Sequence, residues 1–155
     1  MTQRGKLVAF GLIMVLLLPH SAQAAVNCRI NTVAVAFGSY NVFSSSVLTS
    51  VGSVSIRCVG IGVGTSPVSV SLNHGNSGNF QSRKMFMGSE TLNYNLYLDP
   101  GGSQIWGDGT SGTQMFSATS SNNQTMNLPI FGRMPAGQDV SVGIYSDTII
   151  ATINF

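Results

Sequence analysis

The sequence is poor in charged residues, cysteine and histidine. Charged residues make up 8% of the 155 residues, and there are only two cysteines and two histidines. So few ionisable side chains leave little material for acid–base catalysis or for a metal centre. The chain also lacks a C-x-x-C pair and a Gly-rich phosphate loop that opens a helix. We therefore expect no enzyme activity and no catalytic, cofactor-binding or metal-binding residues.

Two of the basic residues lie in an apolar leader. Arg4 and Lys6 precede an unbroken apolar run over residues 7–18, which is followed by the small-residue pattern Ala22-Gln23-Ala24. This order is typical of a secretory signal peptide, predicted for residues 1–24. A membrane anchor, the alternative, needs about 20 apolar residues and does not end in such a pattern. We expect the mature domain to cover residues 25–155.

The expected mature domain carries no formal net charge. Its basic and acidic residues balance, namely Arg29, Arg57, Arg83, Lys84 and Arg133 against Glu90, Asp99, Asp108, Asp139 and Asp147. This balance provides no basic patch for nucleic acid or an anionic membrane. Net charge near zero favours association, so it suits a protein that assembles.

No long helix is predicted after residue 24, because Gly, Ser, Thr and Asn interrupt every apolar pattern of helical period. Short alternating runs bounded by turn residues occur instead, and such runs indicate strands. The predicted strands cover residues 29–37, 52–59, 68–72, 92–98, 125–130, 140–145 and 148–155. This number and spacing of short strands predict a single all-β domain, an immunoglobulin-like β-sandwich.

The last predicted strand is unusually apolar on one face. Its alternation places four residues on that face, namely Ile149, Ala151, Ile153 and Phe155. Nothing in the sequence follows to pair with this strand, so we expect an exposed sheet edge. An unprotected apolar edge promotes aggregation unless another segment supplies a strand, and we expect these four residues to face the core beside an acceptor groove.

Cys28 and Cys58 are the only cysteines, and both follow the predicted signal peptide. An exported protein folds in an oxidising compartment, where two cysteines of one chain normally form a disulfide. We therefore predict a Cys28–Cys58 bond.

Several short motifs, taken in order, resemble one family. They are Phe37-Gly38-Ser39-Tyr40, Gly52-Ser53-Val54-Ser55-Ile56-Arg57-Cys58, Leu92-Asn93-Tyr94-Asn95-Leu96-Tyr97-Leu98-Asp99, Trp106-Gly107-Asp108-Gly109-Thr110, Phe131-Gly132-Arg133-Met134-Pro135, Gly137-Gln138, and the ending from Gly143 to Phe155. Together they resemble the spore coat protein U domain, which is shared with pilins of archaic chaperone-usher pili.

The resemblance implies a sandwich that lacks its last strand until a partner completes it. A periplasmic chaperone would lend a strand first, and after passage through an outer-membrane usher a neighbouring pilin subunit would supply one. The chain would then be a secreted structural or adhesive subunit of a pilus or coat fibre at the cell surface. Only three residues separate the predicted cleavage site from Cys28, too few for a donor strand, so we expect a subunit that accepts a strand without donating one and stands at a fibre end.

Two alternatives remain open at the level of sequence. The domain could complete its own sandwich and act as a free-standing secreted coat or ligand-binding protein. Residues 83–87 (Arg-Lys-Met-Phe-Met) place two cations beside apolar side chains; they predict an exposed loop or, as an alternative, an adhesive contact with an abiotic or host surface. Trp106, beside an Asp-Gly turn signal, is a second candidate for a sugar or surface contact.

Overall fold

The computed structural model describes residues 25–155, so the predicted signal peptide lies outside the described residues. The described chain forms strands and one turn of 3-10 helix. In order these are β1 (Asn27–Val33), β2 (Leu48–Val59), β3 (Thr65–Leu72), η1 (Gly75–Ser77), β4 (Arg83–Met87), β5 (Glu90–Tyr97), β6 (Phe116–Ser121), β7 (Thr125–Met134) and β8 (Ala151–Asn154). Among residues 25–155, no helix has the length and hydropathy needed to cross a membrane.

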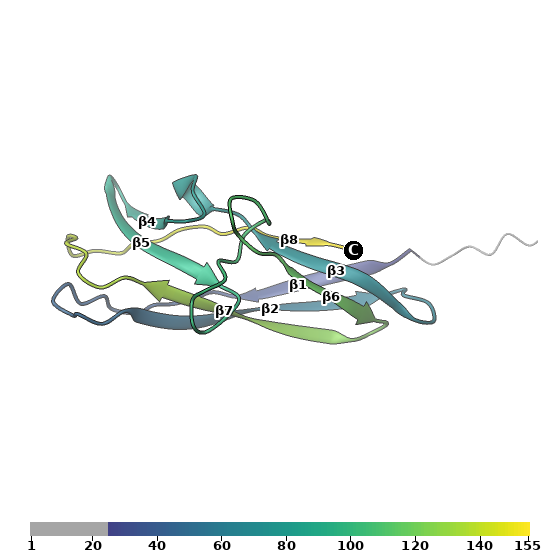
Figure 1. The fold of residues 1–155 in the computed structure, drawn as a ribbon. Helices are drawn as coiled ribbons and strands as arrows, with labels where there is room; N and C mark the ends of the chain where they lie inside the picture. Colours follow the sequence, from purple (N-terminus) through teal and green to yellow (C-terminus); the bar gives the residue numbers. More distant parts are fainter. Residues whose placement is uncertain (1–24) are drawn as a thin grey trace, which may run out of the picture.

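The strands form two sheets that pack into an elongated sandwich (Figure 1). One sheet has five strands in the order β1-β2-β7-β5-β4, and the other has three in the order β6-β3-β8. All neighbouring strands are antiparallel, and the longest ladder joins β2 to β7, from the Leu48–Met134 pair to the Arg57–Thr125 pair. The prediction of an all-β, immunoglobulin-like sandwich is confirmed.

The core follows from the alternation of side chains along the strands. In β2, Val54, Ile56 and Cys58 are fully buried, while the residues between them are more exposed. β3 and β7 supply the facing apolar residues, among them Val70 and Ile130. Because each buried aliphatic side chain stabilises the fold by roughly 1.5–3 kcal/mol, this alternation fixes which face of each sheet turns inward.

The structure contains two strands that were not predicted and lacks one that was, and the first and last predicted strands are too long: β1 ends at Val33 rather than at residue 37, and β8 covers Ala151–Asn154 rather than residues 148–155. β4 and β6 were not predicted, because β4 begins with two cations and β6 consists mostly of Ser, Ala and Thr. The predicted strand at 140–145 is wrong, although its residues alternate. A strand needs a hydrogen-bonded neighbour, and residues 140–145 have none along the edge where they lie.

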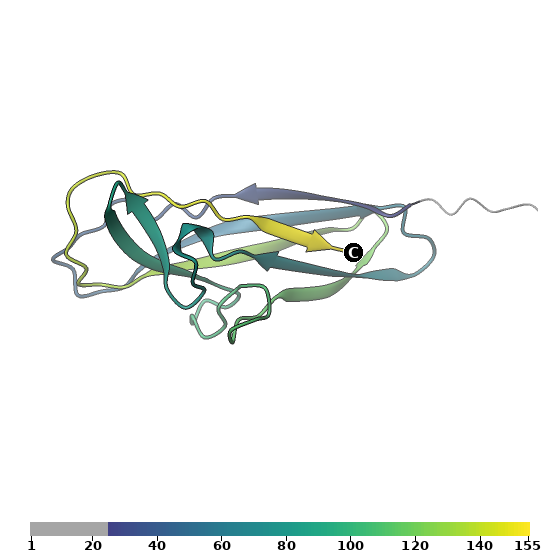
Figure 2. The same ribbon diagram turned by 90° about the horizontal axis from the view of Figure 1, so that it is seen from above.

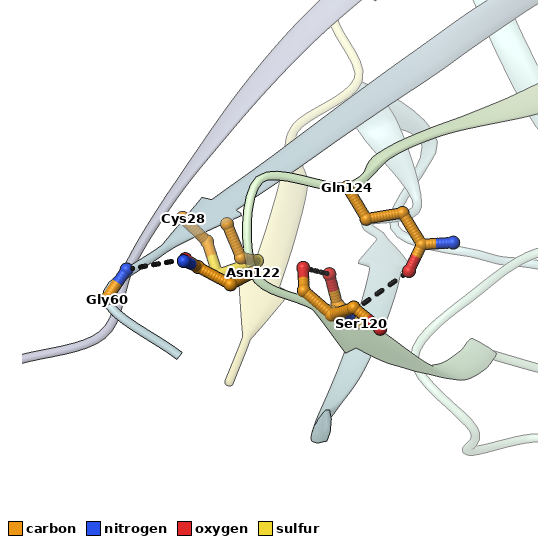
Figure 3. The surroundings of a disulfide bond; sticks show 7 residues. Cys28, Gly60, Ser120, Asn122 and Gln124 are labelled. Atoms are coloured by element: carbon orange, nitrogen blue, oxygen red, sulfur yellow. Dashed lines mark hydrogen bonds between the residues drawn. A yellow bond between two sulfur atoms is a disulfide. The ribbon is translucent and has the colours of Figure 1, made fainter. Parts of the chain in front are cut away.

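The predicted disulfide is present. Cys28 in β1 and Cys58 in β2 are directly opposite each other in the ladder and are joined by a bond between their Sγ atoms. Beside the bond, the Gly60 amide donates to Asn122 Oδ1 at 3.0 Å (Figure 3). The disulfide and the β6–β7 turn thus hold this end of the sandwich together.

Two glycines make room for the chain that follows β1. A Cβ atom on Gly132 would lie 2.5 Å from Val35 Cγ1 and 2.8 Å from Phe37 Cζ, and one on Gly52 would lie 2.5 Å from the Val33 carbonyl oxygen. The absence of side chains at these positions lets Val35 and Phe37 pack against the core from the inner face of the five-stranded sheet.

Replacing Gly132 with alanine is therefore expected to displace Val35 and Phe37. We expect a loss of about 1–3 kcal/mol in the free energy of unfolding, measured by chemical denaturation, because the neighbouring atoms cannot give way without repacking. Gly62→Ala is the matched control, since a Cβ atom there meets nothing within 4 Å. A similar effect of both substitutions would contradict the close packing at Gly132.

Candidate functional site

Of the four edge strands in the described chain, β1, β4, β6 and β8, one from each sheet lies along the same seam: β1 and β8 face each other. β1 pairs only with β2, so its outer edge is free, and β8 pairs only with β3. In the view of Figure 2, β8 lies between β1 on one side and β3 on the other. The sandwich is therefore open along one seam, between an edge of each sheet.

The open seam is an apolar groove. It contains two cavities of about 600 and 310 Å³, both bounded on one side by the chain around β1 and on the other by the chain leading to β8. The larger cavity lies between residues 35–43 and 140–145, and the smaller between residues 32–37 and 147–151. Core residues form the floor, namely Val54, Leu72, Met85, Leu92, Leu96, Ile130 and Met134. We call this feature the seam groove.

Large apolar side chains are exposed along the wider part of the seam groove. Phe43 is 94% exposed and Ile144 is 89% exposed, and both line the larger cavity. Exposed apolar residues that gather at one groove are typical of an interaction site rather than of ordinary surface.

The structure places the predicted terminal-strand residues at the seam groove to different degrees. Ile149 and Ala151 line the smaller cavity and pack against the core. Ile153 is half-buried against the core further along β8, opposite Val70 of β3. Phe155 lies beyond β8 and is 54% exposed, so it is not brought together with the other three.

A carboxylate holds the wall of the seam groove in place. Asp147 Oδ1 accepts hydrogen bonds from the Asn76 amide at 3.0 Å and from Asn76 Nδ2 at 2.8 Å, while the Tyr94 hydroxyl donates to Oδ2 at 2.8 Å. Burial, with the bond to Asp147, raises the pKa of the Tyr94 hydroxyl, which therefore stays protonated as the donor. These bonds tie Asp147 to η1 and β5 and so hold this side of the groove against the sandwich.

A second fixed point joins the loops above the groove to β5. Gln138 makes two bonds to the backbone of Asn93, accepting from its amide at 2.7 Å and donating to its carbonyl at 2.9 Å. The Gln138 amide in turn donates to the Tyr40 hydroxyl, and that hydroxyl donates to the Pro135 carbonyl. This contact could not be predicted from the motifs around Tyr40 and Gln138, because the two residues are 98 positions apart in the sequence.

Arg83 corrects the prediction for residues 83–87, which form strand β4 and not an exposed loop. Its side chain is 0% exposed. Nη1 donates to Asn95 Oδ1 at 2.7 Å, Nη2 donates to the Trp106 carbonyl at 2.7 Å, and both Nε and Nη2 donate to the Asn73 carbonyl. Burial lowers the pKa of Arg83 to about 10. The guanidinium thus links β4, β5 and two loops through oxygen acceptors.

Trp106 is also buried, at 0% exposure, and its Nε1 donates to the Val70 carbonyl at 3.0 Å. The alternative of a sugar or surface contact at Trp106 is therefore wrong. Within residues 25–155, no three His, Cys, Asp or Glu side chains come together as a metal site. The candidate functional site is therefore the seam groove.

Comparisons with known proteins agree with this geometry. The family model described as Spore Coat Protein U domain matches residues 15–152. "Protein U" of Myxococcus xanthus is 31% identical over 134 residues, which cover 77% of this chain and 70% of that protein.

A solved structure with a similar fold is the CsuC–CsuE chaperone–tip adhesion subunit pre-assembly complex from archaic chaperone-usher Csu pili of Acinetobacter baumannii. The similarity covers 84% of this chain at a TM-score of 0.56 and 26% identity, and it spans 40% of the matched chain. With a family model that matches most of its length, this chain belongs to the Spore Coat Protein U domain family.

Proposed function

We propose that this protein is a structural subunit of a bacterial surface assembly, and that it accepts a strand from a partner in the seam groove. The observation that carries the proposal is the pair of unpaired edges, β1 and β8, which face each other across an apolar cavity. A strand added there would hydrogen-bond to the free edge groups and place alternate side chains on the core floor.

The energetics favour such an insertion. About five apolar side chains of an incoming strand could reach the groove floor, each worth roughly 1.5–3 kcal/mol before the cost of ordering the strand. The exposed apolar side chains at the wide end, Phe43 and Ile144, would be covered at the same time. An exposed edge with this composition is prone to aggregation, so occupancy also protects the subunit.

The family and the similar structure support a chaperone and other pilus subunits as the partners that supply the strand. The matched complex contains a chaperone and a tip adhesion subunit of a chaperone-usher pilus, which supports a periplasmic chaperone as the first donor. We further propose an outer-membrane usher and other pilin subunits as later partners, and export through the periplasm to the cell surface. Since this fold and family are those of coat and pilus subunits, they support a role that is not enzymatic.

A second candidate is a free-standing coat or ligand-binding domain that completes its own sandwich. The observation that favours it is the chain after β1, where Val35, Phe37 and Tyr40 already pack against the core beside the groove. In this case the chain would fill its own seam, and a donor strand would have little left to bury.

An appended strand distinguishes the two candidates. We would fuse a strand of ten residues, alternating Val and Thr, after Phe155 through a flexible Gly/Ser linker that lets it turn back along β8. Under the proposal, the free energy of unfolding rises by at least about 2 kcal/mol. Amides on the outer edge of residues 32–37 also become protected from hydrogen exchange.

The matched control has the same ten residues with the apolar pattern shifted by one position. Such a shift turns every Thr toward the groove and every Val toward solvent, so it removes the apolar contacts but keeps the composition. Equal stability of the two fusions and the unfused protein, with the β1 edge already protected, would establish the self-complete domain instead.

A further inference from the structure

We propose that the outer face of the five-stranded sheet carries a second site, which binds an acidic saccharide such as a uronate. The site is a cavity of about 420 Å³, within the range of small-molecule sites. Its lining includes Gln81, Ser82, Asn93, Tyr97 and Arg133. We call it the outer-face pocket. This inference does not depend on the proposed strand acceptance.

The alternation of β5 and β7 places this pocket on the side of the sheet away from the seam groove. Leu92 and Leu96 of β5 are buried in the core, whereas Asn93 and Tyr97 lie on the opposite face. In β7, Met134 lines the seam groove and its neighbour Arg133 lines the outer-face pocket. The two sites share only Tyr94 among their lining residues, so both can be occupied in the same molecule.

The side chain of Tyr97 gives the pocket an aromatic surface. Tyr97 of β5 is directly opposite Phe131 of β7, and Phe131 is directly opposite Val51 of β2. These three residues share the outer face, where Val51 is exposed and both aromatic side chains are half-buried; Tyr97 lines the cavity, and Phe131 and Val51 continue the apolar face beside it. A pyranose ring has an apolar C–H face that stacks on such a side chain, and the Tyr97 hydroxyl adds a polar group at the edge.

Residues with unused hydrogen-bonding groups line the cavity together with Tyr97. Arg133 donates from Nη1 to the Gly101 carbonyl, Asn93 accepts from the Ser82 hydroxyl, and Gln81 donates to the Ser111 carbonyl. Among the described residues, no partner is present for Arg133 Nε and Nη2, Asn93 Nδ2, Gln81 Oε1 or the Tyr97 hydroxyl. Donors and an acceptor that converge on one cavity fit the hydroxyl groups of a sugar.

The charge of the pocket favours a carboxylate on that sugar. Arg133 lies in the lining, Lys84 is directly opposite Asn93 in the β4–β5 ladder, and no Asp or Glu lines the cavity. A guanidinium with two free nitrogen atoms, here Nε and Nη2, binds a carboxylate more specifically than a neutral hydroxyl. The geometry therefore points to a uronate rather than a neutral sugar.

The test uses the protein from residue 25 onward with α-1,4-digalacturonate as the probe, and the matching neutral α-1,4-digalactoside for comparison. Titration followed by amide chemical shifts should give a dissociation constant of about 1 mM or lower for the acid. The shifts should centre on Asn93, Tyr97 and Arg133. The neutral sugar should bind at least tenfold more weakly, and sodium acetate at equal ionic strength should leave these amides unchanged.

Two substitutions test whether Asn93 and Tyr97 contact the saccharide. Asn93→Asp introduces a carboxylate of nearly the same shape and should weaken binding at least fivefold, whereas Tyr97→Leu keeps an apolar contact with Phe131 and should weaken it by removing the ring. Asn127→Asp is the control, because residue 127 is about 20 Å along β7 from Arg133, well beyond the screening length. The proposal is overturned by absent binding, by equal affinity for the neutral sugar, by acetate producing the same shifts, or by shifts that map elsewhere.

Discussion

Replacing Arg83 with alanine is expected to destabilise the fold by about 3–5 kcal/mol. The substitution removes a fully buried side chain, leaves the carbonyls of Asn73 and Trp106 without their side-chain donor, and removes one of the two donors to Asn95 Oδ1. Unpaired buried acceptors and the resulting cavity act in the same direction. Chemical denaturation of the purified domain measures the effect directly.

Arg57→Ala is the matched control for this experiment. Arg57 is also a strand cation, but it is exposed and makes only a long contact of 3.4 Å from Nη2 to Asn123 Oδ1. Its loss should change the free energy of unfolding by no more than about 0.5 kcal/mol. Arg83→Lys should fall between the two, because lysine keeps the charge but cannot reach all the acceptors. If Arg83→Ala and Arg57→Ala were equally stable, the buried network would contribute nothing.

Removal of the disulfide is the other change with a large expected effect. The double variant Cys28→Ala/Cys58→Ala should lose about 3–4 kcal/mol of stability, because the unfolded chain regains the freedom of a loop spanning 30 positions. Denaturation with and without a reductant measures this loss. The two cysteines also face each other in the β1–β2 ladder, so the bond secures an edge strand that has no second neighbour.

The double variant provides its own internal control. Reductant should lower the stability of the unmodified protein to about that of the variant and should leave the variant unchanged. Peptide mapping without reduction should recover Cys28 and Cys58 in one linked peptide. Free thiols at both positions in exported protein would contradict the bond.

Strand alternation could be predicted from sequence where it records burial on one face. β2, β3, β5 and β7 contain alternating or continuous apolar residues bounded by turns, and the predicted runs fall within or largely overlap these strands. The same reasoning failed for residues 140–145, which alternate but lie on an unpaired edge. Alternation indicates which side chains face the core, but it does not show whether a neighbouring strand is present to pair with the segment.

One wall of the seam groove could be predicted from the sequence, and the other could not. The apolar alternation from Ile149 to Ile153 predicted a strand beside an open edge, and the structure places Ile149 and Ala151 in the seam groove. The facing wall, residues 32–43, could not be predicted, because it comes from the other end of the domain. Gly132 and Gly52, which admit Val35 and Phe37, are recognisable only once the crossing chain is known.

The sequence by itself determined the all-β class, the single disulfide and the apolar face of the last strand, because these depend on local period and on cysteine count. Only the tertiary structure decided that Arg83 is buried, that Asp147 anchors the groove wall through Tyr94, and that two free edges face each other. A cation next to apolar residues has the same local pattern in an exposed loop as in a core. Its burial depends on whether distant segments bring enough oxygen acceptors around it, and that is settled by packing rather than by neighbours in sequence.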